Sequence, residues 1–355
     1  MIWKGQDRKT FFILGAGATR GAFSHALLNR KRIRAPLNSD FFKVVETFVR
    51  AQENHGAFRA RYERIRRVFR DEFPTRGRWP IGMEEAFSLL YVSKDFPEIY
   101  RAAQGRQRQA GSRKEIEDFL RLTFAILTVI ESKAATDTLY DRLVLNVGPE
   151  DCMVTLNYDT MLDSALVRSG WNPARGYDIG GASGKIEWRM RKPADVVRLR
   201  NVRLLKLHGS LNWYVRASYE ELSAVFQKKP SKIVISQLPR TNETQGFIRQ
   251  IVPPIYGKFF GHSHWQRLWD TAHKELVSAQ LLVVIGCSLV DTDFHLNGMI
   301  GHAIAVRKRH RRKLEGVIVV NGTTVRRKWL RLLKGSFLKT ESFRRFAGFA
   351  DAYLN

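Results

Sequence analysis

Short, uninterrupted runs of apolar residues recur in two parts of the chain and predict buried strands. The first run, Thr10–Leu14, leads directly into a glycine turn, and the others come after Gly148. These runs lack the apolar–polar alternation of a strand with one solvent-facing side, so they suit a parallel sheet covered on both faces. The later predicted strands are Cys152–Leu156, Val202–Leu207, Lys232–Ser236, Gln280–Ile285 and Gly316–Val320.

Helical patterns fill the chain between the first strand and the later ones. Ala18–Asn29 is typical of a helix, and apolar residues at i, i+3, i+4 spacing recur in Phe41–Val49 and Ile116–Leu127. The polar, basic stretch Gln104–Lys114 predicts an exposed loop. Strands that alternate with helices predict an α/β fold, a Rossmann-like doubly wound parallel sheet with a large helical insertion after the first βα unit. The predicted domains are residues 1–35 with 141–355, which form the sheet domain, and residues 36–140, which form the helical lobe.

The composition is that of a globular chain outside any membrane. Of 355 residues, 44% are hydrophobic and 26% are charged, and no stretch has the roughly 18 apolar residues that a membrane helix needs. The amino terminus has no signal-peptide pattern. Cys152 and Cys287 lie in apolar runs and are expected to be buried, reduced thiols, as in a cytoplasmic protein. Two cysteines also exclude a four-cysteine zinc ribbon.

The charge is strongly positive, since 60 Lys and Arg face 34 Asp and Glu and give a net charge of +26. Such an excess attracts polyanions and makes a nucleic-acid partner a hypothesis. The densest run is Arg307–Lys313. The solvated end of a helix is the alternative explanation of this run, and it stays open.

Five strings place reactive or ligand-binding residue types at predicted strand ends. Gly15, Ala16, Gly17 and Thr19 form a strand-to-helix turn whose backbone can approach a pyrophosphate, although Arg20 replaces the third glycine of the usual G-x-G-x-x-G pattern. A plain tight turn is the alternative.

Two more polar groups follow the next two predicted strands of the sheet. Asn157 and Asp159 follow one strand, where each could also cap the next helix. His208 follows another and leads into the turn Gly209-Ser210; a histidine takes up a proton near neutral pH, but a lone one is often structural.

The last two strands end in GCSLVDTD and VVNG. Gly286 permits close backbone approach, and Ser288 and Asn321 could hydrogen-bond a ribose or phosphate oxygen. A glycine turn with Asp291 or Asp293 as the helix cap is the alternative.

Taken in order, GAGAT, TLNYD, KLHGSLNW, GCSLVDTD and VVNG resemble the sirtuin-like NADase domain of bacterial anti-phage defence proteins. The resemblance implies that NAD is the substrate and that Asn157 and His208 are the catalytic pair. It places Asp159 in the nicotinamide–ribose pocket. Thr19 stands where the family often has Ser, which keeps the hydroxyl. The NAD-binding residues that the resemblance implies are Gly15, Ala16, Gly17, Thr19, Asp159, Gly209, Ser210, Gly286, Ser288 and Asn321.

The resemblance also implies an activity and a setting. The activity is an NAD+ hydrolase that releases nicotinamide and ADP-ribose and depletes NAD on infection. We expect no zinc, because the two cysteine pairs of zinc-bearing sirtuin deacylases are missing after His208. Regulation by homo-oligomerisation, or by a partner ATPase, translocase or other nucleic-acid-sensing protein, is expected. The alternatives are an NAD-dependent deacylase or ADP-ribosyltransferase, and a nucleic-acid-binding subunit on a non-catalytic sirtuin-like scaffold.

Overall fold

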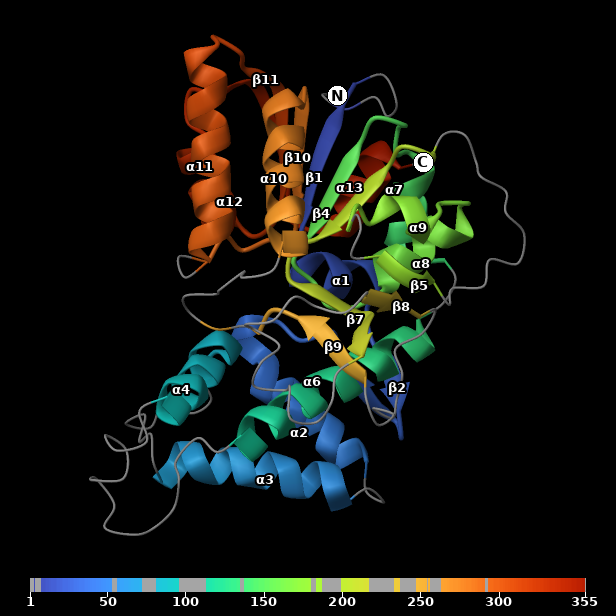
Figure 1. The fold of residues 1–355 in the computed structure, drawn as a ribbon, viewed down its shortest axis with the longest axis vertical. Coiled ribbons are helices and arrows are strands. Elements are labelled where there is room, and N and C mark those ends of the chain that lie inside the picture. Colours follow the sequence, from blue (N-terminus) through green and yellow to red (C-terminus); the bar gives the residue numbers. More distant parts are fainter. Residues whose placement is uncertain are drawn as a thin grey trace. The chain divides into compact units, whose positions relative to one another are not determined.

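The chain forms two compact units in a computed structural model (Figure 1). Unit 1 is Met1–Phe23, Ala135–Val252 and Phe259–Asn355, and unit 2 is Ser24–Ala134 with Pro253–Lys258. The domain boundaries given above stay predictions beside this description. The structure describes residues 3, 8–52, 56–71, 81–95, 113–134, 137–179, 183–186, 199–216, 233–236, 247–253, 255, 263–290 and 293–354.

Unit 1 is built on a six-stranded sheet in which every described pairing is parallel. The strands lie in the order β12-β11-β10-β1-β4-β6. Their bounds are β1 Thr10–Leu14, β4 Cys152–Thr155, β6 Arg203–Lys206, β10 Leu281–Ile285, β11 Leu314–Val320 and β12 Phe337–Phe343. β1, β4 and β10 are buried along their whole length, as their continuous apolar sequences predict. The Rossmann-like fold class is thereby confirmed.

Helices cover both faces of this sheet (Figure 1). One face carries α1 Ala16–Ala22, α7 Leu139–Leu145, α8 Met161–Arg168 and α13 Phe346–Tyr353. The other face carries α10 Ser263–Ser278, α11 Phe294–Arg309 and α12 Thr323–Leu332. A further short helix, α9, is Pro173–Gly176. Each crossover helix runs back from the carboxyl edge of the sheet to its amino edge, as parallel strands require.

Unit 1 also contains a smaller four-stranded sheet in the order β5-β8-β7-β9. Its strands are β5 Ser183–Ile186, β7 Gly209–Arg216, β8 Ile233–Ile235 and β9 Phe247–Ile251. β8 falls within the predicted strand Lys232–Ser236, but it pairs antiparallel with β7. Its assignment to the parallel sheet was therefore wrong.

Unit 2 is mainly helical, as predicted for the insertion. It contains the hairpin β2 Ala26–Leu28 and β3 Lys31–Ile33, the 3-10 turn Asn38–Asp40, and the helices α2 Phe41–Ala51, α3 Gly56–Asp71, α4 Met83–Asp95 and α6 Arg113–Lys133. Stacked and edge-to-face aromatic rings of Phe41, Phe42, Phe87 and Phe119 form its core. The predicted loop Gln104–Lys114 lies outside the described residues except for its last two, which begin α6.

The predicted helix Ala18–Asn29 is wrong beyond Ala22. α1 ends there, and the chain continues into the β2–β3 hairpin. Asn29 and Arg30 form the turn between its strands and have φ of 45° and 62°. Two consecutive positive φ angles are the signature of a tight hairpin turn, in which Asn is favoured. Turn chemistry at Asn29 therefore outweighed the apolar periodicity.

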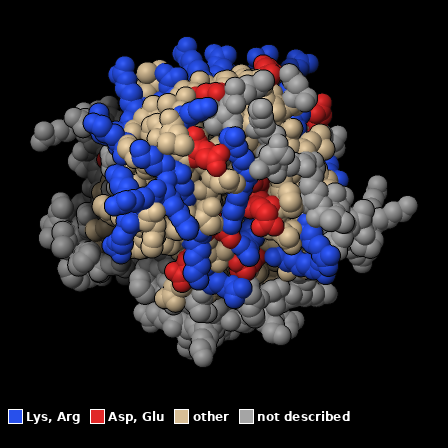
Figure 2. Space-filling view, turned by 90° about the horizontal axis from the view of Figure 1, so that it is seen from above, with Lys and Arg blue, Asp and Glu red and all other residues tan. Residues whose placement is uncertain are grey.

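Lys and Arg outnumber Asp and Glu on the face of the molecule shown in Figure 2. This view is from above in Figure 1, from the side on which β1 begins. The positive charge of the chain is thus visible on this face.

Candidate functional site

Five adjacent strands of the parallel sheet end at one level, and each is followed by one of the strings found in the sequence. The register pairs Leu14 with Thr155 and Ile285, Thr155 with Lys206, and Ile285 with Val320. The chain leaves β1 toward β4 and β6 on one side and returns through β10 to β11 on the other. The order therefore reverses between β1 and β10, where open α/β sheets form a crevice beyond the carboxyl ends of the strands.

The two glycine turns at this switch point pack directly against each other. Gly15 N donates to the Ile285 carbonyl and Gly17 N to the Gly286 carbonyl, each at 3.0 Å. A Cβ on Gly286, whose φ is +61°, would stand 2.0 Å from the Ala18 nitrogen. The glycines are thus required by backbone-to-backbone contact. The turn leaves Ala16 exposed at its tip.

The loop after β10 is held from a second side by β11 and α12. The Cys287 carbonyl accepts hydrogen bonds from Asn321 Nδ2 at 3.1 Å and from Trp329 Nε1 at 2.9 Å. Asn321 Oδ1 also accepts from the Gly322 amide, so this side chain is used by the protein itself. Ser288 is exposed. Burial raises the pKa of the Cys287 thiol to about 12, which keeps it neutral and unsuited to nucleophilic attack.

Asn157 joins the end of β4 to the turn after β1. Its Nδ2 donates to the Gly15 carbonyl and to Thr19 Oγ1, both at 2.9 Å. The side chain is half-buried, and no described residue donates to its Oδ1. The predicted catalytic amide therefore has a fixed orientation and an oxygen with remaining hydrogen-bonding capacity.

Thr19 and Asp159 are buried and bonded to each other. The Thr19 hydroxyl donates to Asp159 Oδ2 at 2.8 Å and lies 3.0 Å from the Tyr140 hydroxyl. Burial raises the pKa of Asp159, although the ammonium of Lys206 and the Thr19 hydroxyl both act to lower it. Thr19 accepts from Asn157, and Asp159 in turn accepts from Thr19; only 1% of Thr19 and 5% of Asp159 is exposed.

A buried ion pair lies beneath this cluster. Lys206 Nζ contacts Asp163 Oδ2 at 3.0 Å and donates to the Asp159 carbonyl at 2.5 Å, and both charged side chains are fully buried. Asp163 Oδ1 also accepts from the Tyr177 hydroxyl. These hydrogen bonds connect β6, α8 and the segment after α9.

His208 follows β6 and faces the start of α11. Its Nε2 lies 3.5 Å from Asp293 Oδ2, and its ring centroid lies 6.4 Å from that of Trp269 in α10. Asp293 Oδ1 accepts from the Leu296 amide, so the residue caps α11 and meets the histidine with its other oxygen. An aspartate in this position can fix the imidazole and stabilise its protonated form. Both side chains are almost fully buried.

The Gly-Ser turn after His208 is committed to the small sheet. Gly209 has φ of +83°, and a Cβ there would lie 2.1 Å from the Gln250 carbonyl oxygen. Ser210 is fully buried and donates to Asn212 Oδ1 at 2.6 Å. Both residues thus have structural partners in this conformation.

The structure places the predicted site residues at three levels of exposure. Ala16 and Ser288 are exposed; Gly17, Asn157, Gly286 and Asn321 are half-buried; Gly15, Thr19, Asp159, His208, Gly209 and Ser210 are buried. Asn157 and His208 follow neighbouring strands at the same level, although their side chains contact different elements. The sequence did not identify the roles of Tyr140, Lys206, Asp163 and Trp269.

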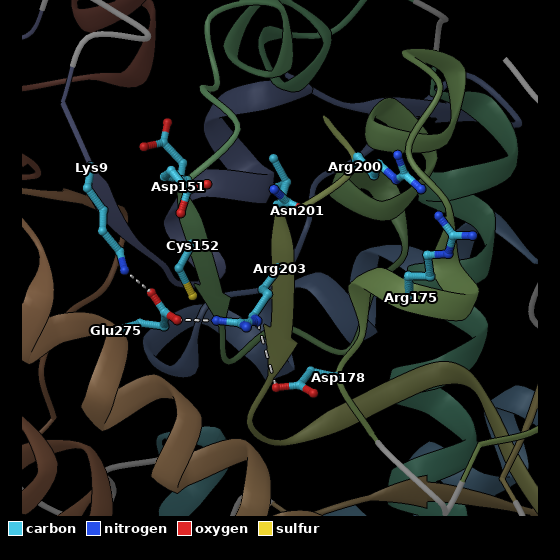
Figure 3. Close-up of a pocket in the computed structure, with 11 residues that line it drawn as sticks. Lys9, Asp151, Cys152, Arg175, Asp178, Arg200, Asn201, Arg203 and Glu275 are labelled. Carbon is cyan, nitrogen blue, oxygen red and sulfur yellow. Dashed lines mark hydrogen bonds and ion pairs between the residues drawn. The ribbon is translucent and has the colours of Figure 1, made fainter. Parts of the chain in front are cut away.

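A polar cavity of about 480 Å³ lies at the opposite, amino edge of the sheet (Figure 3). Glu275 there pairs with Lys9 at 2.8 Å and with Arg203, and Arg203 lies 3.9 Å from Asp178. Asp151 accepts from the amides of Thr10 and Gly148 at its border. None of the predicted site residues lines this cavity.

The described residues contain no group of three or more His, Cys, Asp and Glu side chains that could hold a metal ion. Cys152 and Cys287 are free and buried, as expected. No helix in the described part of the chain is long and apolar enough to cross a membrane.

Comparison with known proteins gives one family match. The model of the SIR2-like domain matches residues 151–338, more than half of the chain. Solved structures include a complex of a Sir2 homologue with NAD, 11% identical, over 98% of this chain and 88% of that one, with a TM-score of 0.43. Another is a mutant Sir2 homologue with ADP ribose, 13% identical, over 67% and 74%, with a TM-score of 0.36. No curated protein matches the sequence.

Proposed function

Because the chain belongs to the SIR2-like domain family, we propose that it binds NAD at the carboxyl edge of its parallel sheet and hydrolyses the nicotinamide–ribose bond. The products are nicotinamide and ADP-ribose. The observation that carries the proposal is the convergence of five motif-bearing strand ends at the β1/β10 switch point.

The groups at this edge suit a dinucleotide. The Ala16 amide, the Ser288 hydroxyl and Asn157 Oδ1 keep hydrogen-bonding capacity that no described residue uses. An amide and a hydroxyl beside glycine turns are typical donors to phosphate and ribose oxygens. The buried Thr19 and Asp159 act in this proposal by holding Asn157 in place.

The chemistry requires a poor nucleophile, water, to reach a ribose carbon as the nicotinamide ring leaves. The ring is positively charged in NAD+ and departs as neutral nicotinamide, so positive charge develops on the ribose. Asn157 Oδ1 orients the water or a ribose hydroxyl, and His208 accepts the proton that is released. Asp293 supports the imidazolium at 3.5 Å. We include Asp293 as a positioning residue because it touches the base rather than the substrate.

The test is nicotinamide release from NAD by the purified protein, followed by chromatography. Asn157→Ala and His208→Ala are each expected to lower turnover by about 100-fold or more. Asn146→Ala and His302→Ala are matched controls in unit 1, since neither follows a strand of the sheet, and they should retain activity. Unchanged turnover in Asn157→Ala and His208→Ala would remove both catalytic assignments.

The biological role that we propose is depletion of cytoplasmic NAD during phage infection, with regulation by self-assembly or a partner protein. Cells that express the wild-type chain should lose NAD after infection, whereas cells with His208→Ala should not. Equal NAD levels in both infected cultures would contradict this role.

A further inference from the structure

Seven cations form a patch at the amino edge of the parallel sheet. They come from the last turn of α11, the turn that follows it, and the end of α12. We call this set the amino-edge patch; its members are Lys308, Arg309, Arg311, Arg312, Lys313, Arg331 and Lys334, and all are exposed.

The two segments that supply the patch are joined. Leu314 N donates to the Ser336 carbonyl at 2.8 Å, which ties the turn after α11 to the turn after α12. α11 and α12 are successive crossovers on one face of the sheet, so both end at its amino edge. The view onto this edge shows more Lys and Arg than Asp and Glu side chains (Figure 2).

The patch cations have no acidic partner among the described residues, whereas several other basic residues of unit 1 do. Arg203 pairs with Glu275, Arg168 with Asp141, Arg267 with Asp178 and Arg8 with Glu315. None of the seven forms such a pair.

Arg307, the buried residue of this basic run, is not a member of the patch. Arg307, the first residue of the basic run, is only 4% exposed and donates to the carbonyls of Leu276, Val277 and Ala279 at the end of α10. Cations near a helix carboxyl end gain a little from its dipole, but seven exposed like charges repel one another. A polyanion would relieve that repulsion.

We propose that the amino-edge patch binds the phosphate backbone of duplex DNA. Residues 307–313 and 331–336 contain no Phe, Tyr or Trp, so the patch lacks the aromatic rings on which single-stranded bases stack. The patch lies at the edge opposite to the predicted catalytic residues, so bound DNA leaves the carboxyl edge uncovered. The proposal does not depend on NAD cleavage.

The test is binding of the full chain to a short labelled DNA duplex by fluorescence anisotropy, between about 50 and 200 mM salt. The triple variant Arg309→Glu/Arg312→Glu/Lys313→Glu should bind at least about tenfold more weakly. The slope of log affinity against log salt should fall by about 2.7, since each phosphate contact contributes about 0.9. The neutral triple variant Arg309→Gln/Arg312→Gln/Lys313→Gln should give the same direction of change if the charge-reversed protein does not fold.

The control reverses an equal number of charges, two Arg and one Lys, at other positions in unit 2. Arg30→Glu/Lys31→Glu/Arg32→Glu changes three exposed residues of the β2–β3 hairpin and should leave the affinity within about twofold of wild type. An equal loss in both triple variants would show a diffuse charge effect and overturn the assignment to the patch. Absence of binding by wild type, or tighter binding of single-stranded DNA or duplex RNA, would overturn the choice of duplex DNA.

Discussion

Replacing Lys206 by Met tests how much the buried Lys206–Asp163 ion pair contributes to the free energy of unfolding. Lys206 and Asp163 are both 0% exposed and their charged atoms lie 3.0 Å apart. Lys206→Met keeps most of the side-chain volume but leaves Asp163 with the Tyr177 hydroxyl as its other side-chain partner. An uncompensated buried charge of this kind costs about 3–5 kcal/mol.

A second variant separates the effect of the unpaired Asp163 charge from the effect of losing the Lys206 side chain. Lys206→Met/Asp163→Asn removes both charges and retains an oxygen that can accept from Tyr177. Because replacing both members of a buried pair is often nearly neutral, the double variant should be more stable than the single one by about 2 kcal/mol or more. Arg168→Met is the control: its partner Asp141 is near the surface, and Arg168 is 38% exposed, so the loss should stay below about 1 kcal/mol.

The assay is urea unfolding followed by tryptophan fluorescence. Trp171 and Trp213 suit it because their rings contact Tyr177 edge-on, at 5.1 and 5.2 Å. The two compact units need not unfold together, so the whole fluorescence transition is compared between variants rather than converted to one global stability. A loss in Lys206→Met no larger than that in Arg168→Met would refute the reasoning, as would a double variant no more stable than the single one.

Two further predictions concern pH and packing. Burial raises the pKa of Asp151 to about 7, so its stabilising contribution is complete below its ordinary pKa of 3.8 and is lost as pH rises through about 7. Between pH 5 and 8, wild type should lose about 2–3 kcal/mol more unfolding free energy than Asp151→Asn, measured by urea titration; equal losses would contradict this sign. Gly286→Ala should lower the melting temperature, because its Cβ would lie 2.0 Å from Ala18 N. Gly298→Ala in α11 should not, because no neighbouring atom lies within 4 Å of its Cβ. The melting temperatures of both variants are measured by calorimetry.

The strands of the parallel sheet could be predicted where burial on both faces leaves an apolar run. β1 and β10 follow this rule. β12 at the sheet edge does not: its sequence FLKTESF is half exposed, with Leu338 at 64%, and carries no such signal. The β2–β3 hairpin was missed because its turn geometry at Asn29 overrode a helical pattern.

The positions of the site residues could be predicted better than their contacts. Asn157, His208 and Gly286 follow the ends of β4, β6 and β10, as expected. The partners of these residues come from distant segments: Thr19 reaches Asp159 across 140 positions, and Asp293 meets His208 from another crossover. Sequence spacing has no access to such pairings, because they exist only after the sheet has formed.

α11 runs from the carboxyl edge of the sheet to its amino edge. Its cap, Asp293, stands beside the imidazole of His208, and its last turn carries Lys308 and Arg309. Sixteen residues make a rod of about 24 Å. The exposed cations of the last turn therefore lie about 24 Å from the carboxylate that faces the imidazole, so a ligand on those cations makes no direct contact with His208.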